Sequence, residues 1–223
     1  RFQPKAKTYF SRRVAAANSS PHFCKPSQKT MKICFATNNA KKVEEVAAAL
    51  KGLIEIVSLR DIGCTVELPE TGDTLEHNAF EKARYVNQHF GVSCFADDTG
   101  LEVAALDGAP GVYSGRFAGE PRSDARNLSL LLEKMQGQTN RSARFRTVIA
   151  LILDGKEYQF EGIAEGEITS SPSGEGGFGY DPIFQALGFD RTFASLSLAE
   201  KNEISHRGKA VKALLNFLRA GKF

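Results

Sequence analysis

The sequence predicts an α/β fold with a long mixed twisted sheet, flanking helices, and two lobes that hold the candidate site in the cleft between them. Apolar runs of strand length alternate with helix-period segments over the first hundred residues, which is typical of strands joined by crossover helices. Two β-rich runs at 143–153 and 157–168 flank Asp154-Gly155, a strong hairpin signal. The acidic pair Asp97-Asp98 directly follows another apolar run, and open α/β sheets bind ligands where strands end.

Composition is that of an ordinary globular protein. With 223 residues, 42% of them hydrophobic, the chain can form one large domain or two small ones. It contains no run of about eighteen apolar residues, which argues against a membrane span. The four cysteines stand apart without a Cys-x-x-Cys pair, which argues against a zinc site, a disulfide scaffold or a thioredoxin-like motif. This cysteine pattern fits a reducing compartment.

Charge is divided unevenly along the chain. The first 30 residues hold seven bases and no acid, whereas the remaining 193 hold 22 bases and 26 acids, a net charge of −4. Residues 1–30 also lack sustained periodicity, so we expect a basic, disordered leader there. We expect one domain over residues 31–223.

The leader has more than one interpretation. An acid-free segment with arginine and serine resembles an organelle transit segment, but Met31 directly precedes the first predicted strand and is an alternative start. We favour the second, which predicts a cytoplasmic location. A basic arm can also bind nucleic acid, yet no downstream segment interleaves aromatic and basic residues as a binding face does. Nucleic acid is therefore the weaker candidate partner.

The first predicted strand, residues 32–36, leads through a polar turn into a helix whose apolar positions follow helical spacing. A turn that enters a helix N-terminus offers backbone N–H groups to an anion, and two lysines add positive charge here. No P-loop or dinucleotide glycine pattern is present, and such a turn alone is more often a capped helix with a solvated first turn. The residues of this candidate phosphate turn are Thr37, Asn38, Asn39, Ala40, Lys41 and Lys42.

A second strand at 54–58 precedes a turn-rich acidic segment around Glu70 and a helix at 75–90. The buried stripe of this helix leaves Asn78 and Lys82 together on an adjoining face. Propensity disfavours an asparagine within a helix, and its ordinary interpretation is a polar surface position.

The apolar run at 92–98 ends in two adjacent carboxylates. The run can be buried only as an interior strand, so we expect Asp97 and Asp98 to emerge at its carboxyl end. Neighbouring carboxylates repel, and Mg²⁺ would remove the repulsion, since it usually takes one or two carboxylates and completes its shell with water and substrate phosphates. The alternative is an Asp-Asp turn closed by Thr99 and a glycine.

Later segments complete the predicted second lobe. A helix at 123–136 precedes the hairpin, and the glycine-rich loop 173–182 follows it. Glycines let a backbone approach a ligand closely, and Phe178 in this loop would be exposed unless a ring such as a purine stacked on it. Ser197 and Glu200 form a capping box at the start of the final helical region.

Taken in order, these segments resemble the inosine/xanthosine triphosphate pyrophosphatase family. The similarity lies in the Thr-x-Asn-x-x-Lys turn, in Glu-Thr-Gly-x-Thr with Asn-Ala-x-x-Lys-Ala, in Ala-Asp-Asp-Thr-Gly-Leu and in Gly-x-Pro-Gly-x-Tyr-Ser-x-Arg. It runs from about Met31 to the C-terminus and leaves the basic leader out. Asn38 departs from the glycine that many members have, but asparagine tolerates positive φ better than most residues.

The resemblance implies hydrolysis of deaminated purine nucleoside triphosphates, namely ITP, dITP and XTP, to the monophosphate and pyrophosphate by a homodimer. Asp98 is the candidate catalytic residue, and Glu70, Asp97 and Asp98 are the candidate Mg²⁺ ligands. Besides the turn at 37–42, the candidate substrate-binding residues are Lys82, Thr99, Phe178, Gly179, Tyr180, Asp181, Lys201, His206 and Arg207.

Elementary chemistry supports this assignment of roles. A metal neutralises charge on phosphate while one carboxylate orients a water, and Lys42 and Lys82 can hold a triphosphate as point charges. Hypoxanthine and xanthine present an acceptor at O6, which His206 and Arg207 can serve, whereas adenine presents a donor there. The non-enzymatic alternative is a nucleotide-sensing or nucleic-acid-binding protein that uses the same turn with the basic arm.

Overall fold

In the computed structural model, described over residues 31–50 and 54–221, a seven-stranded mixed sheet carries helices on both faces. The sheet has the order β2-β1-β3-β5-β6-β7, with β4 paired to β3. Strands β1 and β2 run parallel to each other and β1 runs parallel to β3, whereas the pairs from β3 onward are antiparallel. The predicted α/β class with a mixed sheet and flanking helices is confirmed. The basic leader predicted at 1–30 lies outside the described residues.

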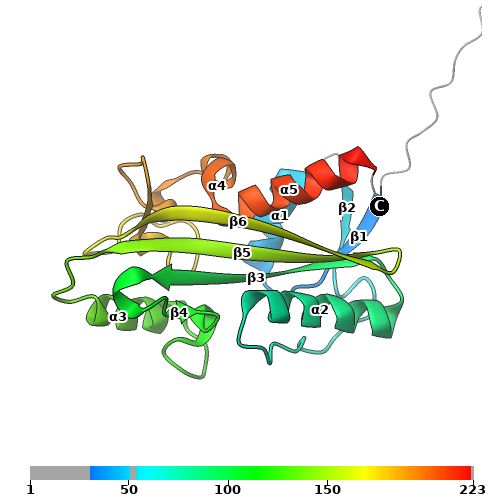
Figure 1. Ribbon diagram of the computed structural model, residues 1–223, viewed down its shortest axis with the longest axis horizontal. Helices are drawn as coiled ribbons and strands as arrows, with labels where there is room; N and C mark the ends of the chain where they lie inside the picture. The colour runs from blue at the N-terminus through cyan, green and yellow to red at the C-terminus, as the bar shows by residue number, and fades with distance from the viewer. Residues whose placement is uncertain (1–30, 51–53, 222–223) are drawn as a thin grey trace, which may run out of the picture.

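The strands and helices alternate as the sequence pattern predicts. The strands are β1 (Met31–Phe35), β2 (Ile54–Val57), β3 (Cys94–Val103), β4 (Pro110–Gly111), β5 (Ser142–Leu153), β6 (Lys156–Ile168) and β7 (Phe184–Ala186). The helices are α1 (Ala40–Leu50), α2 (Leu75–Phe90), α3 (Asp124–Lys134), α4 (Leu198–Ile204) and α5 (His206–Ala220). Helices α2 and α3 lie on one side of the long strands, and α4 and α5 lie on the other (Figure 1).

Local chemistry sets the ends of α2 and separates α4 from α5. The Thr74 side chain caps the first turn of α2 by accepting from the His77 N–H, and Gly91 ends the helix with φ of 65°, where glycine carries no Cβ penalty. Ser205 ends α4 and its side chain caps α5. A Cβ on Gly208 would lie 1.8 Å from the Asn202 carbonyl oxygen, so only glycine permits this close packing of α4 on α5.

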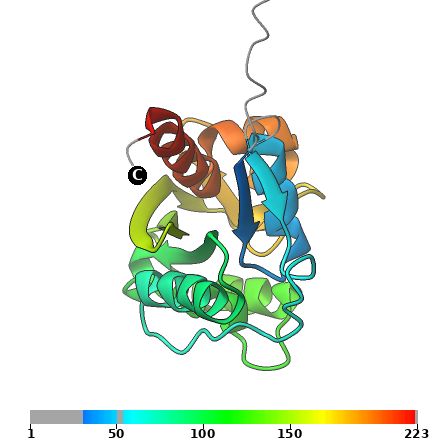
Figure 2. The ribbon, with the colours of Figure 1, turned by 90° about the vertical axis from the view of Figure 1, so that its right-hand side faces the viewer.

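The core divides along the length of β3. Its first half packs between two clusters on opposite faces, one built on Ala79 and Val86 of α2 and the other on Val211 and Leu214 of α5. Figure 2 shows α2 and α5 on opposite sides of the strands. The second half of β3 belongs to a third cluster with α3, β7 and the segment after it. These separate cores correspond to the two predicted lobes on one sheet.

Strand β3 is longer than predicted, and this corrects the placement of the acidic pair. We expected the strand to end at Asp98, but β3 continues to Val103 because β5 pairs with it from Cys94 to Val103. On its other edge, β1 pairs only with Cys94 and Phe95, and β4 only with Leu101 and Glu102. Asp97 and Asp98 therefore lie in a gap between two partner strands and not at the end of their own strand.

None of the helices in the described part of the chain combines the length and the apolar composition that a membrane crossing needs.

Candidate active site

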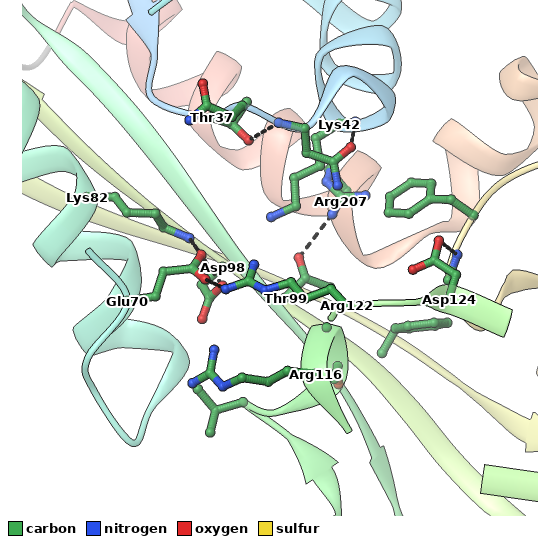
Figure 3. Close-up of a pocket in the computed structure, with 18 of the residues that line it drawn as sticks. Thr37, Lys42, Glu70, Lys82, Asp98, Thr99, Arg116, Arg122, Asp124 and Arg207 are labelled. Carbon is green, nitrogen blue, oxygen red and sulfur yellow. Dashed lines mark hydrogen bonds and ion pairs between the residues drawn. The ribbon is translucent and has the colours of Figure 1, made fainter. Parts of the chain in front are cut away.

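A cavity of about 270 Å³ opens where β3 lacks a partner on one edge. Segments far apart in the chain form its wall: the turn before α1, the loop before α2, the middle of β3, the β4–α3 connection, the glycine-rich loop, and the start of α5 (Figure 3). The predicted site residues all line this cavity except Ala40, Lys41, Asp97 and Asp181. The structure therefore brings most of the predicted set together.

The phosphate turn is partly capped by its own side chains. The Asn39 carboxamide oxygen accepts from the N–H groups of Lys41 and Lys42 at 3.0 and 3.3 Å, and the Thr37 hydroxyl accepts from the Asn39 N–H. Within the described residues, this leaves the N–H groups of Asn38 and Ala40 without an acceptor. The turn thus keeps donors for an anion, but fewer than a bare helix N-terminus would offer. Lys41 points to solvent, 62% exposed, beside Glu44.

The gap in β3 explains why two lysines converge on the backbone. The Phe95 carbonyl accepts from the Ala36 N–H of the chain leaving β1. The next carbonyl on that edge belongs to Asp97 and meets no strand, since β1 has ended. Lys82 Nζ donates to this oxygen at 2.8 Å, and Lys42 Nζ donates at 3.4 Å. The unpaired edge thereby fixes two ammonium groups in the middle of the cavity.

Asp97 and Asp98 point to opposite faces of the sheet, because successive side chains alternate along a strand. Asp97 Oδ1 accepts from Lys42 at 3.0 Å, and its Oδ2 accepts from Arg207 Nε at 3.1 Å. Burial alone would raise the pKa of the Asp97 carboxyl, but Lys42 and Arg207 outweigh it and hold that pKa far below its usual range. Asp97 is therefore a buried, permanently ionised partner for two cations.

Asp98 lies on the other face with a different set of neighbours. Its Oδ2 accepts from the Asn78 carboxamide at 3.1 Å, and its Oδ1 lies 3.2 Å from Lys82 Nζ. Lys82 also donates to Glu70 at 2.7 Å. Burial raises the pKa of the Asp98 carboxyl above its usual value, and Lys82 only partly offsets this. Asp98 is thus the carboxylate of the pair that is better suited to accept a proton.

The donor set at Asp98 fits a divalent cation that shares its shell with a ligand. Glu70 and Asp98 bring two carboxylates against one ammonium, Lys82, and Mg²⁺ usually takes one or two carboxylates plus phosphate oxygens. The predicted third ligand, Asp97, does not join them, because strand alternation turns it toward Lys42 and Arg207. Among the described residues, no three Asp, Glu, His or Cys side chains are arranged to hold a metal. The set of three ligands stays a prediction, of which Glu70 and Asp98 lie against the same lysine.

The glycine-rich loop is folded around Asp181, which is buried. The Asp181 carboxylate accepts from the Phe178 N–H at 2.8 Å and from Lys201 Nζ. A Cβ on Gly177 would lie 2.1 Å from that carboxylate, and Gly177 has φ of 71°, so the loop requires glycine here. Asp181 does not reach the cavity, but it holds the half-buried Phe178 ring at the cavity wall.

Two buried cations back the Phe178 ring. Lys201 Nζ lies 5.1 Å from its centroid, and the Arg207 guanidinium carbon lies 5.6 Å away. Lys201 binds Glu45 at 2.6 Å, and Arg207 Nη1 binds the same carboxylate at 2.5 Å. Arg207 Nη2 donates to Thr99 Oγ1 at 3.1 Å. Three of the five N–H donors of Arg207 are thus engaged, so its predicted contact with a base stays a prediction that rests on the other two.

His206 lines the cavity and has one ring nitrogen without a partner among the described residues. Its ring stacks on Phe145 with centroids 4.5 Å apart, and its Nδ1 is buried with no partner among the described residues. Burial, with Arg207 and Lys201 nearby, pushes the pKa of His206 well below its usual value, so the ring is neutral at pH 7. A buried polar atom without a partner is costly, and His206 is also among the residues that line the cavity.

Several residues that shape the site were not among the predicted site residues. Glu45 was missed because the sequence does not distinguish it from Glu44, although Glu45 is buried and Glu44 is exposed. Asn78, for which a surface position was the ordinary interpretation, is 1% exposed and ties Asp98 to the Gly72 N–H. Its helical position beside Lys82 was the available signal. Arg116, Arg122 and Asp124 also line the cavity (Figure 3).

Comparisons with known proteins agree with this geometry. A family model described as the Ham1 family matches residues 33–217. A Flavobacterium johnsoniae protein named dITP/XTP pyrophosphatase is 54% identical over 192 residues, covering 86% of this chain and 100% of its own length. A Porphyromonas gingivalis protein of the same name is 51% identical over 192 residues, covering 86% and 99%. The solved Ham1 protein of Staphylococcus aureus is 38% identical, with a TM-score of 0.78 over 86% of this chain and 100% of its own.

Proposed function

The chain belongs to the Ham1 family, and from this we propose that it hydrolyses deaminated purine nucleoside triphosphates to the nucleoside monophosphate and pyrophosphate. ITP, dITP and XTP are the proposed substrates, in keeping with the names of its relatives. Hydrolysis of this kind removes damaged purines from the nucleotide pool.

The proposed hydrolysis is supported by the charge balance of a cluster beside the phosphate turn. The cluster of Glu70, Asp98 and Lys82 holds two carboxylates and one ammonium, and the next cation, Arg122, is 48% exposed and 3.6 Å from Glu70, so the buried members of the cluster carry one excess negative charge. Excess buried charge is costly unless a counter-ion neutralises it. The cluster lies beside the phosphate turn and faces the same cavity, which is where a triphosphate with its divalent cation would compensate that charge.

We propose Mg²⁺ as the cation, held by Glu70 and Asp98. When bound, it would supply positive charge to the phosphate oxygens at the reacting centre. Lys82 and Lys42, both fixed on the Asp97 carbonyl, hold phosphates from the floor of the cavity. The free N–H groups of Asn38 and Ala40 bind further phosphate oxygens at the turn.

Asp98 is the proposed proton acceptor for the attacking water. A base must lie within reach of the proton that it accepts, and Asp98 lines the cavity, whereas Asp97 does not line it and is held by Lys42 and Arg207. Asn78 donates to Asp98 Oδ2 and so fixes the direction of the carboxylate. Asp97 instead serves to position Lys42 and Arg207.

The base end of the cavity is proposed to be formed by Phe178, His206 and Arg207. Phe178 offers an apolar face for stacking, which does not depend on the exocyclic groups of the purine. The His206 ring and the two free N–H donors of Arg207, both of which line the cavity, supply hydrogen bonds to the base edge. A base with the wrong donor pattern would leave such buried groups unpaired, which supports strong discrimination.

Release of phosphate tests the proposed activity. The full chain is incubated with ITP, Mg²⁺ and inorganic pyrophosphatase, and orthophosphate is measured with and without the coupling enzyme. Orthophosphate that depends on the coupling enzyme, together with IMP, is the expected result. Direct orthophosphate release without the coupling enzyme would indicate cleavage at the γ-phosphate. No turnover with retained nucleotide binding would favour the nucleotide-sensing alternative.

We also propose a homodimer and a cytoplasmic location, both carried by the family resemblance. The three described cysteines, Cys34, Cys64 and Cys94, are free and buried, which agrees with a reducing compartment. Sedimentation equilibrium of the full chain measures the assembly, and a monomer at micromolar concentration would contradict the dimer. Nucleic acid is not proposed as a partner.

A further inference from the structure

The cations that line the cavity differ in how far their charge is already compensated. Lys82 and Lys42 each lie within 3.2 Å of a carboxylate, as do the buried cations at the base end. Arg116 has no carboxylate within ion-pair distance among the described residues, and its guanidinium lies only against the Tyr113 ring, 5.2 Å from the centroid. Arg116 therefore brings an uncompensated positive charge to the cavity wall.

The positive charge of Arg122 is only weakly compensated by nearby carboxylates. Its guanidinium lies 3.6 Å from Glu70 Oε2, 3.9 Å from Glu67 and 3.6 Å from Glu120, distances too long for hydrogen bonds. Glu67 and Glu120 are largely exposed, so water screens both pairs. In the described part of the chain no hydrogen bond fixes this side chain, which is 48% exposed. Arg122 thus keeps its donors available while remaining close to Glu70.

Both arginines belong to the connection between β4 and α3, on the wall that faces the Glu70–Asp98 side. Figure 3 shows Arg116 and Arg122 extending toward Glu70 and Asp98, with Arg207 farther away. Phe178 lies on the Arg207 side, since the Arg207 guanidinium carbon is 5.6 Å from its ring centroid. If the purine stacks on Phe178, as the proposed function requires, the terminal phosphates of a triphosphate reach the arginine end. The two guanidinium groups then lie where the leaving group departs.

We propose that Arg116 and Arg122 form a binding subsite for the departing pyrophosphate. Guanidinium groups bind phosphate oxygens through a planar fork of donors. Donors placed where negative charge develops on a leaving group lower the barrier for its departure. Bond cleavage between the α-phosphorus and the bridging oxygen leaves that charge on pyrophosphate, and the two arginines accept it without first being released from a tight ion pair.

The proposed subsite predicts that loss of both arginines weakens the binding of pyrophosphate but not that of IMP. Pyrophosphate binding to the full chain with Mg²⁺ is measured by titration calorimetry, and IMP binding is measured in the same way. In the Arg116→Gln, Arg122→Gln double variant, the Kd for pyrophosphate rises at least about tenfold, the loss expected when charge-assisted hydrogen bonds are removed. The Kd for IMP changes by less than about twofold, since IMP has no terminal phosphates.

Arg84→Gln is the control, because Arg84 is half-exposed like Arg122 but is hydrogen-bonded to Glu157 and does not line the cavity. It should leave both Kd values unchanged. Arg122→Lys keeps the charge but loses the fork, so it should weaken pyrophosphate binding less than Arg122→Gln does. Melting temperatures of all variants show whether the fold is intact, and the single variants replace the double one if it unfolds.

Two results would overturn the subsite: unchanged pyrophosphate affinity in the arginine variants, or an equal loss of affinity for pyrophosphate and IMP. A wild-type chain that does not bind pyrophosphate would overturn it as well. The outcome is distinct from that of the activity assay. A chain that loses pyrophosphate binding through these variants but never hydrolyses ITP would keep the subsite and lose the proposed reaction.

Discussion

The two faces of β3 place neighbouring aspartates in opposite electrostatic surroundings. On one face, Asp97 belongs to a buried chain of charges in which three carboxylates alternate with three cations: Asp181, Lys201, Glu45, Arg207, Asp97 and Lys42. On the other face, Asp98 and Glu70 share one lysine. The first set is neutral, whereas the second has two carboxylates for one buried cation, with the half-exposed Arg122 3.6 Å from Glu70. The comparison teaches that the same residue type can serve structure on one face and chemistry on the other.

The pKa shifts of the two carboxyls express this difference. Cations lower the pKa of Asp97, and burial raises that of Asp98. A lowered pKa means that the ionised form stabilises the fold, and a raised pKa means that ionisation costs stability. Stability is thus concentrated on the Asp97 face and reactivity on the Asp98 face.

The largest expected effect is on turnover. Asp98→Asn removes the proposed base and one metal ligand, so kcat for ITP should fall by at least about 10²–10⁴-fold, the range for general base catalysis alone. The melting temperature should not fall, because the amide relieves the cost of a buried charge while Lys82 keeps Glu70. Steady-state kinetics and calorimetry measure the two quantities. An active Asp98→Asn enzyme would contradict the assignment of Asp98.

Asp97→Asn should produce the opposite pattern in stability. Removing this carboxylate leaves Lys42 and one side of Arg207 without their partner in a buried position, and breaking a buried pair costs about 3–5 kcal/mol of unfolding free energy. Urea denaturation of both asparagine variants measures the difference. Equal stability of Asp97→Asn and Asp98→Asn would show that the ionised Asp97 carboxylate does not stabilise the fold more than that of Asp98.

The sequence predicted most of the local structure because the signals are local. The bounds of α2, Leu75–Phe90, were predicted correctly, since a threonine cap and a glycine stop mark them. The hairpin of β5 and β6 was also predicted from Asp154-Gly155. Most predicted site residues share one cavity, because the motifs that carry them lie in the turns and strand segments that the topology brings together.

The features that the sequence did not predict depend on contacts with residues far away in the chain. Strand β3 runs past Asp98 because β5 pairs with it, and within this continuous strand Asp97 faces Lys42 and Arg207 instead of Glu70. Glu45 differs from Glu44 only through Lys201 and Arg207, which lie more than 150 residues away in the sequence. Neither the pairing of β3 with β5 nor the ion pairs of Glu45 can be predicted from the neighbouring sequence.

Phe178→Ala tests the base end of the cavity, and its expected effect is smaller than those of the two aspartate variants. Loss of the stacking surface should weaken the binding of ITP and ATP alike, by about 1–3 kcal/mol. Stability should change little, because the ring is half-buried and Asp181 holds the loop through the backbone N–H of residue 178. Ratios of kcat/KM for the two nucleotides give the selectivity. A selective loss for ITP alone would mean that Phe178 reads the base edge and does not merely stack on it.

The smallest expected effect is the pH dependence of stability, and it also separates the faces. Asp97 and Glu45 have lowered pKa values in the folded state: burial opposes the shift, and the adjacent cations outweigh it. Their stabilisation is complete above the unfolded pKa values, about 3.9 for Asp and 4.3 for Glu, and is lost as pH falls through the folded values. Each group contributes a slope of at most about 1.4 kcal/mol per pH unit.

Asp98 changes the unfolding free energy in the opposite direction on acidification. Its folded pKa is raised, so its protonation removes the cost of burying its charge. The unfolding free energy of Asp97→Asn should therefore depend less steeply on pH below about 4 than that of the wild-type chain. That of Asp98→Asn should fall more steeply on acidification between the raised folded pKa of Asp98 and its unfolded value of about 3.9, because the variant lacks the compensating relief. Urea denaturation across this range, with the exposed Asp190→Asn as control, measures these slopes. Identical slopes for the three variants would show that the acid response arises elsewhere in the molecule and that the two aspartates do not differ in the way their surroundings require.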